Sequence, residues 1–375
     1  MKSNINLIIS TLRWLFLGIR WRLQRGAFNV ATWPREKAML LKLPFITQHI
    51  YGPQQVYYAL DELIVLCLVR NGEYYIKSFI EHYLKLGAKH IVFLDNGSTD
   101  DTIAIAQRYP NVTVLQATCL YGKYENVMKE YLVKRFSKNR WNLFADIDEL
   151  FDYPGSDVMS LSSLLTYLNQ NSYTAVVTQM LDLFSEYPLN EIKSNKEDYI
   201  RELYTYYDIS NIQKSRYGHG KPSNPNIKKI HGGIRKSLFG TENNLSKASL
   251  TFVDRNIKLF VMGHHTRNSR IADFSCVLLH YPFISTFYEK VLDAVQHDRY
   301  QLSASDQYKK YWESLQQNPN LKLKTTTACQ LKSINDLLDN HFLVASEKYH
   351  QWVREQANLN SISHSEISLS PGRIQ

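Results

Sequence analysis

The sequence predicts an α/β protein built on a doubly wound, mostly parallel β-sheet. Three short runs rich in Val, Ile and Leu, at 63–69, 90–94 and 112–115, are typical of strands buried on both faces. Segments with helical spacing separate these strands, and this order gives right-handed crossovers between parallel strands. The helices are expected at 75–86, from about 102, and at 124–136.

Composition and length indicate one large folded domain with appendages. The chain has 375 residues, of which 44% are apolar and 21% are charged. Its four cysteines are far apart and form no Cys-x-x-Cys pair, which favours a reduced, cytosolic setting. We expect an amphipathic and irregular segment over 1–60, a main domain over 61–300 divided near 153, a helical C-terminal extension over 301–360 and a loose tail over 361–375.

The N-terminal segment over 5–25 combines apolar residues with a basic flank. Arg13 interrupts the apolar run, and further arginines follow it, so the segment is too short and too charged to predict a membrane span. One interpretation is an amphipathic helix in peripheral contact with the inner face of the membrane. The other is a helix packed on the domain or on another subunit. The connection over 26–55 is expected to be largely irregular.

The net charge of +9, with a pI near 9.1, favours anionic partners. We interpret the cationic excess as spread along the chain rather than run together, which weighs against a nucleic-acid-binding arm. Nucleoside diphosphates and anionic lipid head groups remain candidate partners, and no nucleic acid is expected.

The segment Asp146-Ile147-Asp148 follows an apolar run that begins near Asn142. If these residues continue a strand, both carboxylates face the same way, roughly 6.5 Å apart at Cα. A divalent cation held between the two carboxylates, and carrying a diphosphate, would relieve their repulsion. The alternative is a strand end that runs into an acidic, solvated turn.

Polar side chains follow three of the expected strands. Arg70 and Asn71 come after the first strand, Asp95 ends the second, and Asp146 with Asp148 follows the fourth. Ligands of doubly wound sheets bind at the carboxyl ends of the strands. We therefore expect these residues to lie on one rim.

Two segments in this order carry a specific resemblance: Asp95-Asn96-Gly97-Ser98-Thr99-Asp100 and, about fifty residues later, Asp146-Ile147-Asp148-Glu149. Over roughly 61–300 the sequence resembles bacterial glycosyltransferase family 2 proteins of the Asp-x-Asp subgroup with the A-type, Rossmann-like fold. Gly72 departs from the family pattern, which usually has Asn and Glu adjacent in the first turn. Further matching pieces are Val69 to Glu73, Phe79 to Gly87, Met180-Leu181-Asp182, Gly232 to Phe239, Lys247, Gly263-His264 and Leu279-His280-Tyr281.

The resemblance implies transfer of a sugar from a nucleoside-diphosphate sugar, with a UDP-sugar as the expected donor and Mn²⁺ or Mg²⁺ as the cofactor. Residues 61–153 would bind the nucleotide sugar, and 154–300 the acceptor. It implies Asp148 as the direct metal ligand and Asp146 on the ribose or on metal-bound water, so that both belong to the metal site. Asp95 resembles the family's base- or ribose-binding carboxylate, its alternative being a turn-forming Asp. Arg70, Asn71 and Glu73 would line the nucleotide pocket, although Arg70 equally fits a surface ion pair.

The second half offers further candidates for the site. Gly232-Gly233 permits close backbone approach, and the following Arg235 and Lys236 suit a diphosphate, unless this is only a basic hairpin. His280 is the candidate third metal ligand, ahead of His264, and imidazole suits manganese better than magnesium. The alternative for His280 is a core histidine whose hydrogen bonds are already satisfied.

Asp182 is the candidate general base, because its apolar and aromatic neighbours are expected to raise its pKa. A structural carboxylate at a strand end is the alternative. The expected function is glycosyl transfer, inverting by family resemblance, to a glycan or lipid-linked acceptor in surface polysaccharide synthesis at the cytoplasmic face of the membrane. A nucleotidyltransferase and a catalytically inactive sugar-binding assembly protein are the alternatives.

Overall fold

The computed structural model describes residues 35–193, 195–261, 263–297 and 303–368, with side chains up to 359. Contacts divide the chain into two units, 1–47 and 48–375. In the first unit the described residues form a helix over 35–46. The amphipathic segment predicted over 5–25 lies outside the described residues. No helix in the described ranges is long and apolar enough to cross a membrane.

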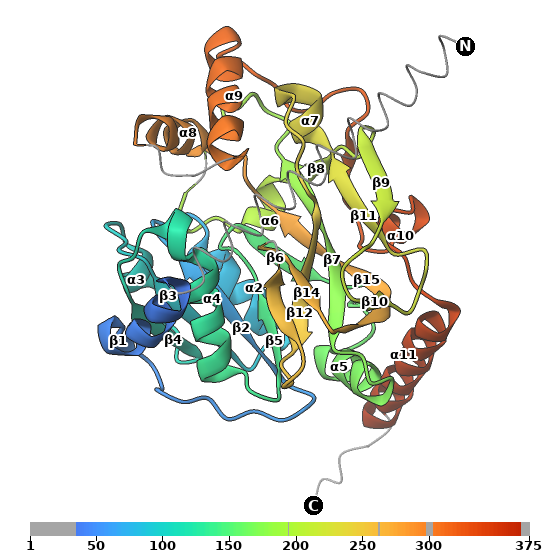
Figure 1. The fold of residues 1–375 in the computed structure, drawn as a ribbon. Helices are drawn as coiled ribbons and strands as arrows, with labels where there is room; N and C mark the ends of the chain where they lie inside the picture. Colours follow the sequence, from blue (N-terminus) through green and yellow to red (C-terminus); the bar gives the residue numbers. More distant parts are fainter. Residues whose placement is uncertain (1–34, 194, 262, 298–302, 369–375) are drawn as a thin grey trace, which may run out of the picture. The chain divides into compact units, whose positions relative to one another are not determined.

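The second unit is built on the predicted α/β sheet (Figure 1). Four parallel strands lie side by side in the order β4-β3-β2-β5. Three helices connect them, and the prediction of a doubly wound, mostly parallel sheet is confirmed. The elements are β2 (Leu63–Val69), α2 (Ile76–Leu86), β3 (His90–Asp95), α3 (Thr102–Ala106), β4 (Val112–Gln116), α4 (Tyr121–Phe136) and β5 (Trp141–Phe144).

A short strand extends the sheet beyond β4. Strand β1 (Gln48–Tyr51) pairs antiparallel with β4. The prediction of an irregular connection over 26–55 is therefore wrong for β1 and for the helix over 35–46. β1 has only four residues, and the helix over 35–46 is too weakly patterned to be predicted from the spacing of apolar residues.

The second half of the chain continues the same sheet beyond β5. Strand β12 (Ser246–Phe252) runs antiparallel between β5 and β7 (Ala175–Phe184), and β15 (Arg270–His280) runs parallel to β7. β6 (Glu149–Asp152) pairs antiparallel with β15, and β10 (Lys221–Pro222) pairs with it in parallel. The sheet therefore joins both halves without a break.

Smaller elements surround this sheet. Strands β9 and β11 form one two-stranded ribbon, and β13 and β14 form another. The remaining elements are α5 (Leu161–Gln170), α6 (Ile200–Leu203), β8 (Tyr206–Tyr207), β9 (Ile212–Arg216), β11 (Lys228–Gly232), α7 (Ile234–Phe239), β13 (Lys258–Val261), β14 (His265–Arg267), α8 (Phe287–Gln296), α9 (Ser303–Gln317), β16 (Cys329–Gln330), α10 (Asp336–Asp339) and α11 (Glu347–Ser368).

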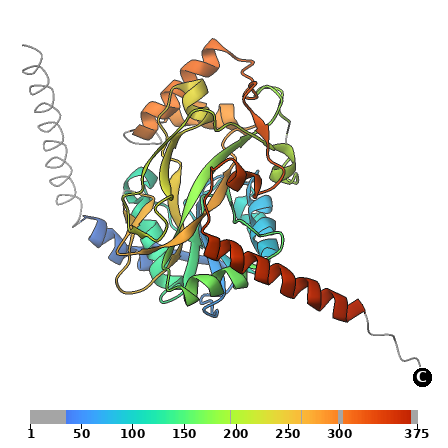
Figure 2. The ribbon, with the colours of Figure 1, turned by 90° about the vertical axis from the view of Figure 1, so that its right-hand side faces the viewer.

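The C-terminal extension is helical, as predicted, but its boundaries differ. The extension is interrupted after α10, which ends at Asp339, and His341 has a positive φ of 60°. That turn buries Phe342 and Leu343 in the core. The predicted loose tail is wrong over 361–368, where α11 continues, with its C-terminal end directed away from the sheet (Figure 2).

Helix α2 holds strand β6 in place through two adjacent side chains. The Tyr83 hydroxyl donates to the Glu149 carbonyl at 2.9 Å and accepts from the Phe151 amide at 2.9 Å. The ring Nε2 of His82 lies 2.7 Å from the Phe151 carbonyl oxygen. Because β6 directly follows Asp148, these bonds fix the segment that carries the two aspartates of the Asp-x-Asp motif.

Replacing Tyr83 by Phe should lower the free energy of unfolding by about 1–3 kcal/mol, because two buried backbone groups lose their partner. Denaturant titration measures the loss. The control is Tyr57→Phe, because Tyr57 is 83% exposed and its replacement should change stability by less than about 0.5 kcal/mol. Equal stability of Y83F and the wild type would show that the hydroxyl does not support β6.

Stability should fall as the pH drops from 6.5 to 4, in part because of His82. Burial, helped by the charge of Arg201, lowers the pKa of His82 to about 4. Between pH 6.5 and 4, His82 is therefore protonated in the unfolded chain but largely neutral in the folded protein. This difference lowers the free energy of unfolding by up to about 3 kcal/mol near pH 4. His82→Gln should flatten this part of the stability–pH curve relative to the wild type, whereas the surface variant His49→Gln should not. Parallel curves for H82Q and the wild type would contradict this.

Candidate active site

The polar residues predicted at the carboxyl ends of the strands lie on one rim, as expected. β2 pairs in parallel with β3 and with β5, so Val69 stands opposite Asp95, and Leu66 opposite Phe144. The turns after these three strands therefore emerge at the same edge of the sheet. Asn71 and Asp146 belong to these turns, and Asp95 is the last residue of β3.

The turn after β2 is tied to the turn after β3. The Asn71 amide donates to the Ser98 hydroxyl, and the Asn71 side-chain oxygen accepts from the Thr99 amide, both at 2.9 Å. The Gly72 amide donates to the Thr102 hydroxyl at 2.7 Å. Asn71 has a positive φ of 52°, which asparagine tolerates better than most residues. These bonds give the rim a defined shape.

Asp95 supports its own turn. Its carboxylate accepts from the Gly97 and Ser98 amides at 3.0 Å, from the Gln116 side chain at 2.9 Å and from the Ser98 hydroxyl. The residue is completely buried. This geometry favours the turn-forming alternative, and contact of Asp95 with a nucleotide stays a prediction.

Arg70 and Glu73 lie at the same turn with different partners. Glu73 pairs with Lys196 at 2.6 Å, and its carboxylate also accepts from the Asp101 amide at 3.3 Å. Arg70 is exposed and makes no hydrogen bond or ion pair with any residue of the described ranges. The Arg70 guanidinium is therefore available at the rim, whereas the Glu73 carboxylate is paired with Lys196.

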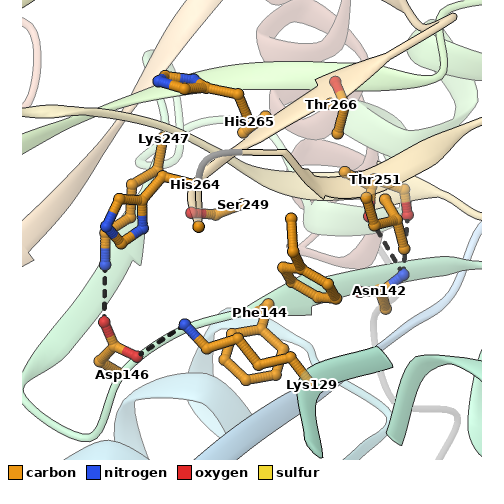
Figure 3. Close-up of a pocket in the computed structure, with 14 residues that line it drawn as sticks. Lys129, Asn142, Phe144, Asp146, Lys247, Ser249, Thr251, His264, His265 and Thr266 are labelled. Carbon is orange, nitrogen blue, oxygen red and sulfur yellow. Dashed lines mark hydrogen bonds and ion pairs between the residues drawn. The ribbon is translucent and has the colours of Figure 1, made fainter. Parts of the chain in front are cut away.

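Asp146 lies between two nearly buried lysines. Its carboxylate is 2.7 Å from the Lys247 ammonium and 3.9 Å from that of Lys129 (Figure 3). Lys247 also bonds Glu149, and Lys129 also pairs with Glu125 at 2.7 Å. Burial raises the pKa of Asp146, but the two lysines outweigh it and hold that pKa well below its ordinary value. Asp146 is therefore ionised and already neutralised.

The two aspartates of the motif do not share one direction. Strand β5 ends at Phe144, and the chain turns at residues 147–148, so the alternation expected for a strand is wrong here. Asp148 instead faces Lys290 of α8, at 3.3 Å, and His280 of β15, at 3.7 Å. The two carboxylates have separate environments, and metal binding by Asp146 stays a prediction that requires Lys247 to move.

His280 lies in a buried chain of charged groups. The parallel register of β7 and β15 places His280 opposite Asp182, with His280 Nδ1 at 2.6 Å from the carboxylate. On its far side, Asp182 accepts from Arg235 Nε at 2.7 Å. The chain of contacts thus runs Asp148, His280, Asp182, Arg235, and it connects the motif to β7, β15 and α7.

The charges in this chain shift several pKa values. Burial lowers the pKa of His280, but Asp148 and Asp182 outweigh it and raise the pKa to about 9. Burial raises the pKa of Asp148, but Lys290 and His280 hold it well below its ordinary value. At neutral pH the structure therefore places an imidazolium between two carboxylates.

The expectation that its surroundings raise the pKa of Asp182 is wrong. Burial does raise it, but Arg235 and His280 outweigh burial and lower the pKa below its ordinary value. A carboxylate held in two charge-assisted bonds is a weak proton acceptor. The geometry therefore favours the structural alternative for Asp182, and its role as a general base stays a prediction.

The residues present fit a divalent cation in a limited way. The described ranges contain no group of three or more His, Cys, Asp or Glu side chains that could hold a metal ion. Asp148 Oδ2 and His280 Nε2 nevertheless converge, and Mg²⁺ and related cations are often held by one or two side chains together with phosphate oxygens and water. Asp182 would then accept the Nδ1–H of neutral His280 and leave Nε2 free as a ligand.

A narrow pocket lies beside Asp146, between β5, β12, α4 and the β13–β14 ribbon (Figure 3). Its volume is about 20 Å³, room for a water molecule but not for a nucleotide. His264 lines it next to Lys247 rather than next to Asp148. Burial and the two nearby lysines hold the pKa of His264 well below its ordinary value.

The glycine pair before α7 serves the local fold. Gly232 and Gly233 have positive φ values of 96° and 76°, and a Cβ at Gly232 would lie 2.4 Å from the Asn211 carbonyl oxygen. Arg235 points at Asp182, and Lys236 pairs with Glu242 at 2.5 Å. Both cations have carboxylate partners in this structure, and their contact with a diphosphate stays a prediction.

Three charged residues of the site were not singled out as site residues by sequence analysis: Lys129, Glu149 and Lys290. Lys129 has the i, i+4 spacing to Glu125 that is typical of a solvated helix face, which hides its burial. Glu149 lies directly after the motif. Lys290 belongs to an ordinary amphipathic helix, so only the tertiary structure brings it to Asp148.

The comparisons with known proteins bear on this site. Residues 64–221 match the sequence model of glycosyl transferase family 2. This match covers β2 to β10 and includes the rim, Asp146, Asp148 and Asp182. It ends before Arg235, Lys247, His280 and Lys290. No curated protein matches the chain.

Two solved structures are similar over part of the chain. The mannosyltransferase PcManGT from Pyrobaculum calidifontis, in complex with GDP-Man and Mn²⁺, aligns over 40% of this chain and 45% of its own, with 16% identity and a TM-score of 0.25. Glucosyl-3-phosphoglycerate synthase from Mycobacterium tuberculosis, in complex with Mn²⁺, UDP and glucosyl-3-phosphoglycerate, aligns over 35% and 52%, with 17% identity and a TM-score of 0.21. The chain spans about half the length of these structures, and likeness at this level carries no argument about the site.

Lys247→Met should lower the free energy of unfolding by about 3–5 kcal/mol, because it leaves Asp146 and the buried Glu149 without their shared cation. Denaturant titration at pH 7 measures this. The matched control is Lys236→Met, which breaks a more exposed pair and should cost about 1 kcal/mol or less. Adding Glu149→Gln to K247M should restore part of the loss. Similar costs for K247M and K236M would show that Lys247 does not neutralise the motif.

Proposed function

We propose that this protein is a glycosyltransferase that uses a nucleoside-diphosphate sugar and a divalent cation. The observation that carries the proposal is the convergence of Asp148 and His280 at the rim of a sheet whose sequence matches glycosyl transferase family 2. A leaving diphosphate gains negative charge as the sugar departs, and a bound divalent cation stabilises it. The rim is where doubly wound sheets bind such ligands.

The roles follow from the contacts of each residue. Asp148 and His280 would hold the cation, and Asp182 would orient His280 through Nδ1. Lys290, 3.3 Å from Asp148, would place a positive charge next to the diphosphate. Arg70 and Asn71 would contact the nucleotide. We assign Asp146 to the ribose or to metal-bound water rather than to the metal itself, because Lys247 and Lys129 already neutralise it.

The finer assignments belong to the same proposal. We expect a UDP-sugar as donor, Mn²⁺ ahead of Mg²⁺ because of the imidazole ligand, and inversion at the sugar carbon. The acceptor is a glycan or lipid-linked glycan in surface polysaccharide synthesis. The residues over 5–25 would bring the enzyme to the inner face of the membrane as a peripheral protein.

A nucleotidyltransferase is the alternative with a similar sheet. Such enzymes need a glycine-rich, basic loop after the first strand, with backbone amides free to hold phosphates. Here the amides of Asn71, Gly72 and Glu73 donate to Ser98, Thr102 and Asp100. This arrangement favours glycosyl transfer. A catalytically inactive sugar-binding protein is the other alternative, and release of nucleoside diphosphate distinguishes it.

Nucleotide sugars should stabilise the protein only when Mn²⁺ is present. A donor at a hundred times its dissociation constant adds about 2.7 kcal/mol, which a thermal shift detects. UDP-, GDP-, CMP- and dTDP-sugars are compared with and without Mn²⁺, and release of nucleoside diphosphate is measured with each. Asp148→Ala and Asp148→Asn should lose the metal-dependent shift, whereas Asp157→Ala, an exposed aspartate, should keep it. If no nucleotide sugar shifts the wild type, the proposal fails.

A further inference from the structure

The cationic excess of the chain is concentrated in one segment. Residues 209–272 contain twelve Lys and Arg against two Asp and Glu, a net charge of +10. The remainder has 32 Lys and Arg against 33 Asp and Glu, a net charge of −1. The interpretation that the excess is spread along the chain is therefore wrong. Seven of the twelve cations lie on β9, β10, β11, β13 and β14, and the others lie on α7, β12, β15 and the connection between β12 and β13, rather than in a terminal arm.

Three strand pairs place two cations opposite each other. Lys228 pairs with Arg216 between β11 and β9, and Lys258 pairs with Arg267 between β13 and β14. Lys221 and Arg270 are partners between β10 and β15. Like charges directly opposite on adjacent strands destabilise a sheet. The three pairs therefore lower the stability of the fold. A bound anionic ligand would relieve the repulsion between the paired cations.

Most of these cations have no acidic partner. Only Arg235, Lys236 and Lys247 of the twelve form ion pairs with Asp or Glu within the described residues. Lys214 and Lys228 bond backbone carbonyls instead, at 2.6 and 2.9 Å. Arg270 bonds the Ser172 carbonyl. The other six cations have neither an acidic partner nor a carbonyl partner in the described ranges: Arg216, Lys221, Lys229, Arg255, Lys258 and Arg267.

Nearby cations, together with burial, lower the pKa values of three histidines in this segment. The His219 and His265 rings stack at 4.0 Å with an interplanar angle of 5°. Burial, Lys229 and Arg267 lower the pKa of His219, and burial, His219 and Lys229 lower that of His265 to about 3. His231 is lowered by burial and Lys229, against a smaller opposing effect of Glu242. The cations of the two ribbons therefore act on one shared set of rings.

The positive segment also lines the pocket beside Asp146. His265 stacks on His219 and also lines the pocket that contains Asp146 and Lys247. The neighbouring His264 lines the same pocket, and its carbonyl oxygen accepts from the Ala248 amide of β12 at 2.8 Å. The β13–β14 ribbon of the positive segment therefore borders the pocket that contains Asp146.

We propose that the strands and connections over 209–261 and 263–272 bind the acceptor, and that the acceptor is a glycan carrying phosphate or carboxylate groups. This inference rests on the proposed function. Repeated anions along an extended chain match cations that are spread over two ribbons. Exposed charges also attract such a ligand from solution in a manner that salt screens.

The absence of exposed apolar side chains decides between kinds of partner. None of the large hydrophobic residues exposed in the described ranges lies within 209–272. Insertion into a membrane interface uses Trp, Phe or Leu, and binding of single-stranded nucleic acid uses exposed aromatic rings on which bases stack. A charged, hydroxyl-rich glycan needs neither. The observations therefore favour the glycan.

Binding of labelled polymers to the full-length protein at low ionic strength tests the proposal. Polygalacturonate supplies carboxylates, polyglycerol phosphate supplies phosphates, and neutral dextran is the reference polymer. One of the two anionic polymers should bind at least about tenfold more tightly than dextran. The triple variant K221Q/K258Q/R267Q should lose about tenfold of this affinity, because exposed ion pairs contribute up to about 1 kcal/mol each. It should also be at least as heat-stable as the wild type.

The matched control is K309Q/K322Q/K332Q, which removes three exposed lysines outside the segment and should change affinity less than about twofold. Equal binding of dextran and both anionic polymers would overturn the proposal, as would equal losses in the two triple variants. Tighter binding to phosphatidylglycerol vesicles or to oligothymidylate would identify a different partner and also overturn it. The wild-type thermal shift with nucleotide sugars, measured on the same sample, tests the proposed function separately.

Discussion

The neutralisation of buried carboxylates by buried cations is the constraint on which the site depends. Burying an ion costs several kcal/mol unless an opposite charge and hydrogen bonds compensate it. Here Lys247 holds Asp146 and Glu149, while His280 and Arg235 hold Asp182. Each cation comes from an element far along the chain from its carboxylate. The charge pairing therefore acts as a set of long-range links between the two halves of the sheet.

These links explain why the second half of the chain returns to the sheet beside β5. β12 brings Lys247 next to the end of β5, and β15 brings His280 next to Asp182 of β7. α2 supports the same region from another side, because Tyr83 bonds the backbone of β6. A site assembled from so many elements is rigid, and its acids cannot change protonation without disturbing several neighbours.

Sequence analysis predicted the first half well because buried parallel strands leave long apolar runs. β2 and β3 followed from such runs, and their parallel order placed Asn71, Asp95 and Asp146 on one rim. Side-chain directions were harder to predict. The turn at residues 147–148 separates Asp146 from Asp148, and Arg235 lowers the pKa of Asp182. The burial of Lys129 and the approach of Lys290 to Asp148 depend on tertiary packing, which leaves no periodic signal.

The same physical rule separates the two groups of cations in this protein. Lys129, Lys247 and Arg235 are buried, so each must have a carboxylate partner. These carboxylates neutralise the three cations within the fold. Lys221, Lys258 and Arg267 are exposed, so water hydrates them and the fold requires no partner. Their charge remains available to a ligand. Within 209–272, whose net charge is +10, Lys247 and Arg235 are buried and build the site, and we propose that the exposed Lys221, Lys258 and Arg267 bind the acceptor.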